Sequence, residues 1–218
     1  MGHLVKALNG GVTQEEARRQ LKVVHDFLVV RGRESVRKLE DSRSGWGSFA
    51  KRARVDLSGA GKPNLVGKSR ERIVEVINMA ATLERMLDAL RWFSTQPEMR
   101  EWLVLECHPS TSSTENGKDL VLGLASGDFR ALCEVTDVVG KSAGQNGKEL
   151  RDLKSLGCGE GVPTDGVRRF ICTSTEFGEA LSCAKRRRWG TWHYSYLKHT
   201  AGESMVLELK PRETGAPT

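Results

Sequence analysis

The sequence of 218 residues lacks the features that mark a membrane protein or a secreted protein. It has no run of 18 or more consecutive apolar residues, which a membrane-spanning helix requires. Its first residues, MGHLVKALNGG, contain neither the apolar stretch nor the cleavage site of a signal peptide. We therefore expect a cytoplasmic protein that does not associate with a membrane.

Cysteine is scarce and follows no pairing pattern. Five cysteines occur, at positions 107, 133, 158, 172 and 183. An odd number without paired spacing is typical of a reducing compartment rather than of a disulfide scaffold. No CxxC pair or Cys/His pair with the spacing of a zinc site is present, so we do not expect structural zinc.

Positive charge is concentrated in one part of the chain. The formal net charge is +6, and residues 31–72 hold twelve Lys and Arg against five Asp and Glu. Residues 101–218 hold 15 basic residues against 16 acidic ones. A local surplus of this kind suits a polyanion such as nucleic acid, and it is equally compatible with a soluble, Arg-rich surface.

The first 95 residues are predicted to be mostly helical. Thr13 and Glu16 have the spacing of a capping box at the start of a helix. Ser69 is predicted to cap a long helix whose apolar positions follow a helical period. The predicted elements are a helix at 13–30, a short helix at 34–39, a basic loop at 41–69 with a short strand near 53–57, and a long helix at 70–93.

Beyond residue 100 the pattern changes to short strands separated by turn residues. Strands are predicted at 102–108, 119–124, 129–139, 168–174, 192–199 and 204–210, and helices at 146–157 and 174–188. This order indicates an α/β fold with a central mixed sheet flanked by helices. We expect a helical N-terminal region at 1–69 that carries the basic loop, and a core domain at 70–218.

Two carboxylates stand out in the predicted hairpin. Asp119 opens the first strand and Glu134 lies within the second, so the two can approach each other at one end of the ladder. Together with the Val135 carbonyl they would form an oxygen-rich site suited to Mg²⁺. A bound Mg²⁺ activates water and stabilises charge on a phosphoryl oxygen. The alternative is that Asp119 closes a turn and Glu134 faces solvent.

Residues 70–175 resemble the core of the PD-(D/E)XK nuclease superfamily, the restriction-endonuclease-like fold. That core has a helix, a three-stranded meander, a crossover helix and a further strand. Its motif is an acid at the start of the second strand and an acid–x–lysine in the third, matched here by Lys118–Asp119 and Glu134–Val135–Thr136. The resemblance implies a Mg²⁺-dependent DNA endonuclease of type II restriction kind, acting on double-stranded DNA as a homodimer.

The sequence departs from this motif at Thr136, which stands where the family has lysine. We expect Lys148, in the first turn of the following predicted helix, to supply the missing cation, although it is also typical of a solvated helix residue. Family members often place a further acid on the helix before the sheet, and Glu84 is the candidate here. A surface ion pair with an arginine explains Glu84 equally well.

The residues expected to contact DNA are basic ones in two segments. They are Arg43, Lys51, Arg52, Arg54, Lys62, Lys68 and Arg70 in the first segment, and Arg186, Arg187 and Arg188 in the second. The second segment, 185–199, mixes cations with aromatic residues, but cations also suit a helix C-terminus and alternating aromatics also suit a core strand.

Other functions remain open on the sequence alone. One is a nucleic-acid-binding protein whose nuclease core has decayed, with Thr136 marking lost catalysis. Another is an RNA-directed or toxin-like nuclease on the same fold. GKSAG at 140–144 matches the GxSxG elbow of serine hydrolases, but the preceding strand lacks the expected apolar run. The Glu208–Leu209–Lys210 triplet also spells acid–x–lysine, and we assign it to a solvated edge strand.

Overall fold

The computed structural model describes residues 3–40, 53–109, 118–136, 152–158, 165–176, 178–179 and 194–211. Its elements, in chain order, are β1 (Leu8–Thr13), α1 (Gln14–Glu40), β2 (Arg54–Asp56), β3 (Arg70–Arg72), α3 (Ile73–Thr95), β4 (Leu103–Cys107), β5 (Leu120–Gly123), β6 (Phe129–Thr136), β7 (Arg168–Ser174), β8 (Tyr194–Ala201) and β9 (Ser204–Pro211). In these ranges no helix is both long enough and apolar enough to span a membrane.

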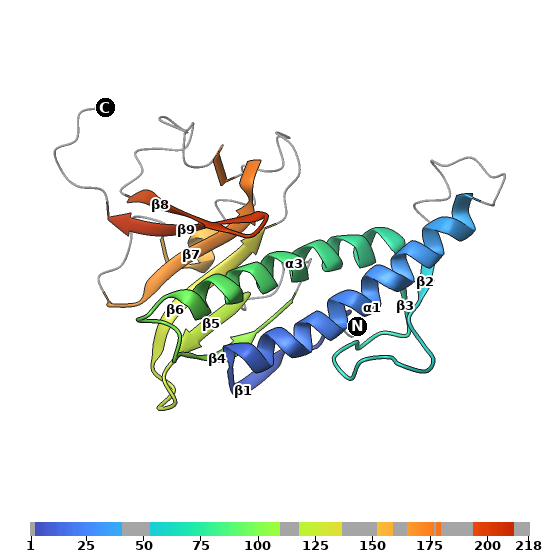
Figure 1. Cartoon of the computed structure of the whole chain (residues 1–218), viewed down its shortest axis with the longest axis horizontal. Helices are drawn as coiled ribbons and strands as arrows, with labels where there is room; N and C mark the ends of the chain where they lie inside the picture. The colour runs from blue at the N-terminus through green and yellow to red at the C-terminus, as the bar shows by residue number, and fades with distance from the viewer. Residues whose placement is uncertain are drawn as a thin grey trace.

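Seven strands form one mixed sheet in the order β1-β4-β5-β6-β7-β9-β8 (Figure 1). All neighbouring pairs are antiparallel except β6 and β7, which are parallel. The prediction of an α/β fold with a central mixed sheet is confirmed. The order of helix, three-stranded meander and parallel strand is also present, in α3, β4–β6 and β7.

The N-terminal part differs from the prediction in two ways. Helix α1 is one continuous helix, because the 34–39 segment extends the 13–30 helix without a break. The Thr13 Oγ1 accepts a hydrogen bond from the Glu16 N–H at 3.2 Å, as the capping prediction requires, whereas the Glu16 carboxylate bonds Arg19 and Gln20 instead of completing the box. Strand β1 was not predicted, and it adds an edge to the sheet by pairing with β4.

The predicted cap at Ser69 is wrong. Residues Arg70–Arg72 form β3, which pairs with β2 in a separate two-stranded ribbon. Helix α3 begins only at Ile73, and Arg72 at its N-cap makes no side-chain capping bond. Pairing with β2 therefore overrides the local helix-start signal of this segment.

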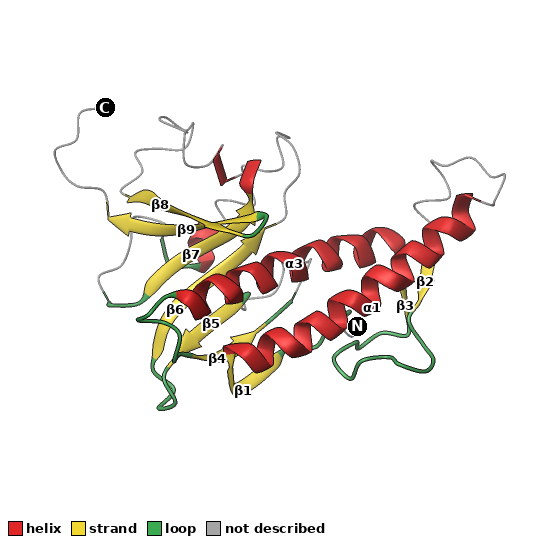
Figure 2. Cartoon of the chain, in the orientation of Figure 1, coloured by secondary structure: helices red, strands yellow, loops and turns green. Residues whose placement is uncertain are grey.

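Helices α1 and α3 both lie on one face of the sheet (Figure 2). Residues from α1, β1, α3 and the strands share a single core cluster, so the regions 1–69 and 70–218 are packed around the same core. A second, smaller cluster covers the opposite face and joins Leu153 and Leu156 to Ile171 and Leu207. The short helical segment at 152–155 thus packs on the face opposite α3.

The assignment of the Glu208 triplet to a solvated edge strand is wrong. Strand β9 lies between β7 and β8, and Glu208 is only 1% exposed. Its Oε1 accepts hydrogen bonds from Arg168 at 2.7 Å and from Lys210 at 2.6 Å. Burial favours the neutral acid, but the bonds from Arg168 and Lys210 outweigh it and lower the pKa of Glu208.

This ion cluster predicts a stability that depends on pH. Because the folded-state pKa of Glu208 lies below its unperturbed value of 4.5, its contribution to the free energy of unfolding is fully present above pH 4.5. The contribution is lost as the pH falls through the folded-state pKa. The Glu208→Gln variant should lower the free energy of unfolding at neutral pH by on the order of 3 kcal/mol and flatten its acid dependence. Urea unfolding at a series of pH values checks both, and an unchanged acid slope would contradict the assignment.

Candidate functional site

The two hairpin carboxylates lie at one end of the β5–β6 ladder. Asp119 directly precedes Leu120, which pairs with Cys133, and Glu134 is the next residue of β6. Asp119 is 8% exposed and Glu134 is 6% exposed, so neither faces open solvent. The structure therefore brings the two predicted acids to neighbouring positions on adjacent strands.

Asp119 is held by the strands on both sides of it. Its Oδ2 accepts a hydrogen bond from the Val135 N–H of β6 at 2.7 Å. Its backbone carbonyl accepts one from the His108 N–H, just beyond β4, at 2.9 Å. The first bond orients the carboxylate, and the second fixes the backbone that carries it.

Glu134 is held by a residue that lies on the face of the sheet opposite α3. Its Oε1 accepts a hydrogen bond from the Ser155 hydroxyl. The Lys118 ammonium donates to the Ser155 carbonyl and lies 3.4 Å from the Ser155 Oγ. Lys118, Ser155 and Glu134 thus form a continuous chain of polar contacts beside Asp119.

The turn that carries Ser155 is well defined by backbone bonds. The helical segment 152–155 ends at Gly157, whose φ of 76° suits glycine. The Cys158 N–H bonds the Leu153 carbonyl at 2.8 Å, and the Gly157 N–H bonds the Lys154 carbonyl at 2.9 Å. This is the Schellman pattern of a helix C-terminus, and it agrees with the predicted helix end at Gly157.

Two cations bind the last carbonyls of this turn. Lys118 bonds the Ser155 carbonyl from one side, and the buried Arg169 donates from Nε to the Leu156 carbonyl at 2.7 Å. Asp165 accepts two bonds from the Arg169 guanidinium, and these bonds lower the pKa of Asp165 to about 2. Cations at a helix C-terminus complement its exposed carbonyls, so the position of Ser155 is strongly determined.

Thr136 lies two residues beyond Glu134, where β6 ends. It is 1% exposed, and its Oγ1 has no hydrogen-bond partner among the described residues. Thr173 faces it across the parallel pair β6–β7, and its buried Oγ1 likewise has no hydrogen-bond partner among the described residues. Two buried hydroxyls that lack partners among the described residues, beside two carboxylates, make this strand end unusually polar for its burial.

The thiols next to this site are not nucleophiles. Burial, with the neighbouring Asp119 charge, raises the pKa of the Cys107 thiol far above its usual value. Burial and nearby negative groups, Asp119 and Glu134 among them, raise that of Cys133 in the same way. The protonated thiol is therefore favoured at both positions, and it is a poor nucleophile.

The donor set fits a magnesium ion better than a transition metal. Within the described ranges, no group of three or more His, Cys, Asp or Glu side chains is arranged to hold a metal. Mg²⁺ is usually bound by only one or two carboxylates and keeps several waters. Asp119 and Glu134 supply two carboxylates at facing positions, whereas a closed zinc site needs four protein ligands.

Glu84 is not brought to the two acids. It lines a hollow on the outer side of α3 together with Arg18 and Lys22 of α1, and no residue of β5 or β6 lines that hollow. Ser155, which contacts Glu134, lies across the sheet from α3. The predicted cation Lys148 and the GKSAG segment fall outside the described residues.

The predicted basic residues are only partly described. Arg54 and Arg70 lie on the β2–β3 ribbon with exposed side chains, and Lys68 forms an ion pair with Glu71. Lys62 lies in the loop between the two strands. The remaining candidates, Arg43, Lys51, Arg52, Arg186, Arg187 and Arg188, fall outside the described residues.

Sequence reasoning missed Ser155 and gave no role to Lys118. Lys118 was recognised only as the residue that precedes the acid, where its charge carried no information about its contact. Ser155 lies 21 positions from Glu134, and nothing in its local sequence points to a carboxylate. No local signal identifies this contact, because it depends on how the chain returns between the parallel strands β6 and β7.

Comparison with known proteins gives no match: no protein-family model, no curated protein and no solved structure is significantly similar to this chain. Functional reasoning therefore depends on the geometry of the site.

The buried hydroxyl of Thr136 predicts the effect of an isosteric change. Thr136→Val removes a hydroxyl that has no partner among the described residues, so the free energy of unfolding should rise by about 1 kcal/mol. Thr173→Val is the matched control and should behave alike. Thermal and urea unfolding of both variants measure this, and a loss of stability in Thr136→Val alone would show that its hydroxyl is hydrogen-bonded.

Proposed function

We propose that this chain is a cytoplasmic, Mg²⁺-dependent endonuclease that hydrolyses phosphodiester bonds in double-stranded DNA, with a restriction-endonuclease-like core. The observation that carries the proposal is the placement of Asp119 and Glu134 side by side at the end of the β5–β6 ladder, both buried and both oriented by fixed hydrogen bonds. A type II restriction endonuclease is the class that we favour.

Asp119, Glu134 and the Val135 carbonyl would hold the metal. When bound, Mg²⁺ supplies an acidified water and stabilises negative charge on a phosphoryl oxygen. The contribution of the chain is to hold both carboxylates in a fixed direction. The Val135 N–H does this for Asp119, and the Ser155 hydroxyl does it for Glu134.

In this proposal, other groups take the role of the lysine that the family has at the position of Thr136. Thr136 offers a neutral hydroxyl that can orient a water but cannot offset charge. Lys118 contacts Ser155, whose hydroxyl in turn bonds Glu134. Lys148 remains the candidate for a cation that approaches the phosphate directly.

The β2–β3 ribbon supports contact with duplex DNA. A two-stranded antiparallel ribbon is narrow enough to enter the major groove. Val55 and Glu71 face inward, whereas Arg54 and Arg70 are exposed on the outer side. The ribbon lies beside the C-terminal end of α1 and the start of α3 (Figure 1), and it contacts both helices.

The first functional prediction concerns the acids. Asp119→Asn and Glu134→Gln should each lower Mg²⁺-dependent cleavage of plasmid DNA by about 100-fold or more, while DNA binding in Ca²⁺ is nearly unchanged. Each change removes a negative ligand and preserves side-chain shape. A nicking assay with and without Mg²⁺, paired with a gel-shift measurement, provides the test.

The control for this experiment is Glu98→Gln, which neutralises an exposed acid that pairs with Arg168 on the α3 side. It should cleave like the unmodified chain. Full activity in either site variant would remove the metal-site assignment. A wild-type chain that binds DNA but never cleaves it, with Mg²⁺ or Mn²⁺, would favour the alternative of a nucleic-acid-binding protein with a decayed core.

The second functional prediction concerns the ribbon. Replacing Arg54 and Arg70 together with Ala should weaken DNA binding and reduce the log–log slope of affinity against salt by about one unit for each lost phosphate contact. Arg100→Ala, at an exposed position in the turn after α3, is the matched control. Fluorescence anisotropy across a salt series measures the slope. An identical slope in the double variant would move the DNA-binding surface to 185–199, and tighter binding of RNA would favour an RNA-directed nuclease.

A further inference from the structure

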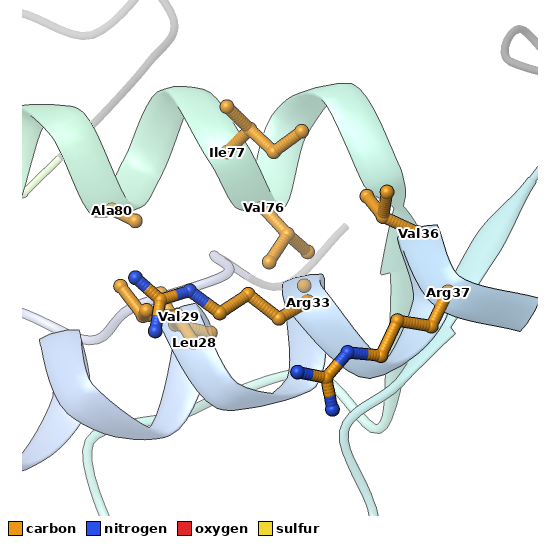
Figure 3. Close-up of a pocket in the computed structure, with 9 residues that line it drawn as sticks. Leu28, Val29, Arg33, Val36, Arg37, Val76, Ile77 and Ala80 are labelled. Atoms are coloured by element: carbon orange, nitrogen blue, oxygen red, sulfur yellow. The ribbon is translucent and has the colours of Figure 1, made fainter. Parts of the chain in front are cut away.

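The two faces of the sheet offer different chemistry. On the helical side, α1 and α3 have a hollow of about 430 Å³ between them, lined mainly by apolar side chains such as Val76 and Ala80 (Figure 3). No acid and no histidine of the described residues lines it. The acids of the candidate site belong to the other side of the sheet, and a further polar residue lies there beside them.

His108 occupies the position that faces Asp119 across the β4–β5 pair. Cys107 of β4 pairs with Leu120 of β5, so the next residues along these antiparallel strands, His108 and Asp119, face each other. The hydrogen bond from the His108 N–H to the Asp119 carbonyl continues this pairing. Glu134 has the corresponding position on β6, on the other side of β5. His108, Asp119 and Glu134 therefore form one row across three adjacent strands.

A bulge in β4 determines which residue reaches this row. The pairing of β4 with β5 shifts by one residue just before Glu106, so Leu105 is the extra residue. In an unshifted ladder, Cys107 would face Asp119, and Glu106 would point into the core beneath the helices. The shift instead places Cys107 in the core and His108 opposite Asp119. Bulges re-aim side chains in this way and are common next to active sites.

Strand β1, the other neighbour of β4, accommodates this bulge with a bulge of its own. Its pairing with β4 shifts between Asn9 and Val12, where Gly10 and Gly11 have positive φ. The six residues of β1 carry no charge, so this strand adds no ion pair beside the outward side chains of β4. The bulge is therefore built into three strands and is not a local irregularity of one.

Glu106 orients the His108 ring. The two residues lie on the face of the sheet opposite α3, because Cys107 between them belongs to the core beneath the helices. The His108 Nε2 lies 3.4 Å from the Glu106 Oε2. An ionised carboxylate only accepts hydrogen bonds, so this contact assigns the ring hydrogen to Nε2. Nδ1 is then an acceptor, and it has no hydrogen bond to any described residue.

The imidazole is open to substrate, whereas the carboxylates beside it are buried. The His108 side chain is 35% exposed, so a group on DNA or a water can reach the ring. Asp119 and Glu134 are both buried. Across the described part of the chain, no three His, Cys, Asp or Glu side chains are grouped to hold one metal, which places His108 beside the proposed metal site and not among its ligands.

We propose that His108 is a further catalytic residue of the endonuclease, whose Nδ1 accepts a hydrogen bond from the attacking water and so directs it toward the phosphorus atom. Glu106 is its positioning residue, because the contact with Nε2 keeps Nδ1 available as the acceptor. The inference rests on the nuclease function proposed above and adds a residue to it. Strands β4, β5 and β6 then contribute one group each to the site.

The test is cleavage of plasmid DNA in Mg²⁺ by the full chain. His108→Ala should lower kcat by about 100-fold, the scale of a misplaced reactant, and leave KM and DNA binding in Ca²⁺ unchanged. His108→Asn places an amide near the position of Nδ1, so it should recover part of this rate. Glu106→Gln should lower kcat by a smaller factor and have no further effect in His108→Ala, since it acts through the ring.

The matched control is His25→Ala. His25 also contacts a neighbouring carboxylate, that of Asp26 at 3.1 Å, but it lies on α1 beside the α1–α3 seam and should be dispensable for cleavage. Circular dichroism shows whether each variant is folded. The nitrogen NMR shifts of the His108 ring, recorded at mildly alkaline pH without metal or DNA and assigned with the Asn variant, give a measurement separate from activity. They should show a hydrogen on Nε2 alone.

Three results would contradict this role of His108. If the unmodified chain cleaves DNA and His108→Ala cleaves equally well, the inference is wrong and the nuclease function stands. A ring that carries its hydrogen on Nδ1 would also overturn it, because no acceptor would remain for the water. A chain that never cleaves DNA would overturn both the nuclease function and the role of His108.

Discussion

The parallel pairing of β6 with β7 is the constraint on which the rest of the structure depends. Two parallel strands cannot be joined by a tight turn, so the chain must return across one face of the sheet. That return brings residues 152–158 over the face opposite α3, where they contribute to the second core cluster. The sheet then lies between the two clusters. It also aligns the carboxyl ends of both strands, and in open α/β sheets such ends are where ligands bind. Glu134, Thr136 and Thr173 lie there together because of this pairing.

The candidate site combines two kinds of support. On one side the acids are fixed by strand bonds, since the Asp119 carboxylate is bound by the backbone of β6. On the other side they depend on a short turn. The last carbonyls of this turn accept hydrogen bonds from Lys118 and Arg169. A carboxylate that is oriented in this way loses little conformational entropy when it binds a cation, which is the general advantage of a preorganised site.

Much of this arrangement could be predicted from the sequence, and the failures have physical causes. Strand β7 was predicted with the observed bounds, and the approach of Asp119 to Glu134 follows from hairpin geometry alone. Strand β1 was missed because Gly10 and Gly11 have positive φ and form a bulge, which resembles a loop in sequence. The contact of Ser155 with Glu134 could not be predicted, because it depends on the path of the crossover. Glu208 was misplaced because an alternating pattern does not reveal whether a strand lies at an edge or in the middle of a sheet.

The buried cysteines have a consequence for how the molecule can be studied. Cys107, Cys133 and Cys172 lie on β4, β6 and β7, so they sample the middle of the sheet. Burial raises the pKa of each thiol, to about 12 for Cys172, and an alkylating reagent reacts only with the thiolate. The three side chains lie in the core cluster beneath the helices, and the Cys172 Sγ contacts the Arg85 carbonyl of α3, so their modification requires the helices to leave this face of the sheet. The rate of modification at these positions measures how often the helices leave the centre of the sheet in the native protein.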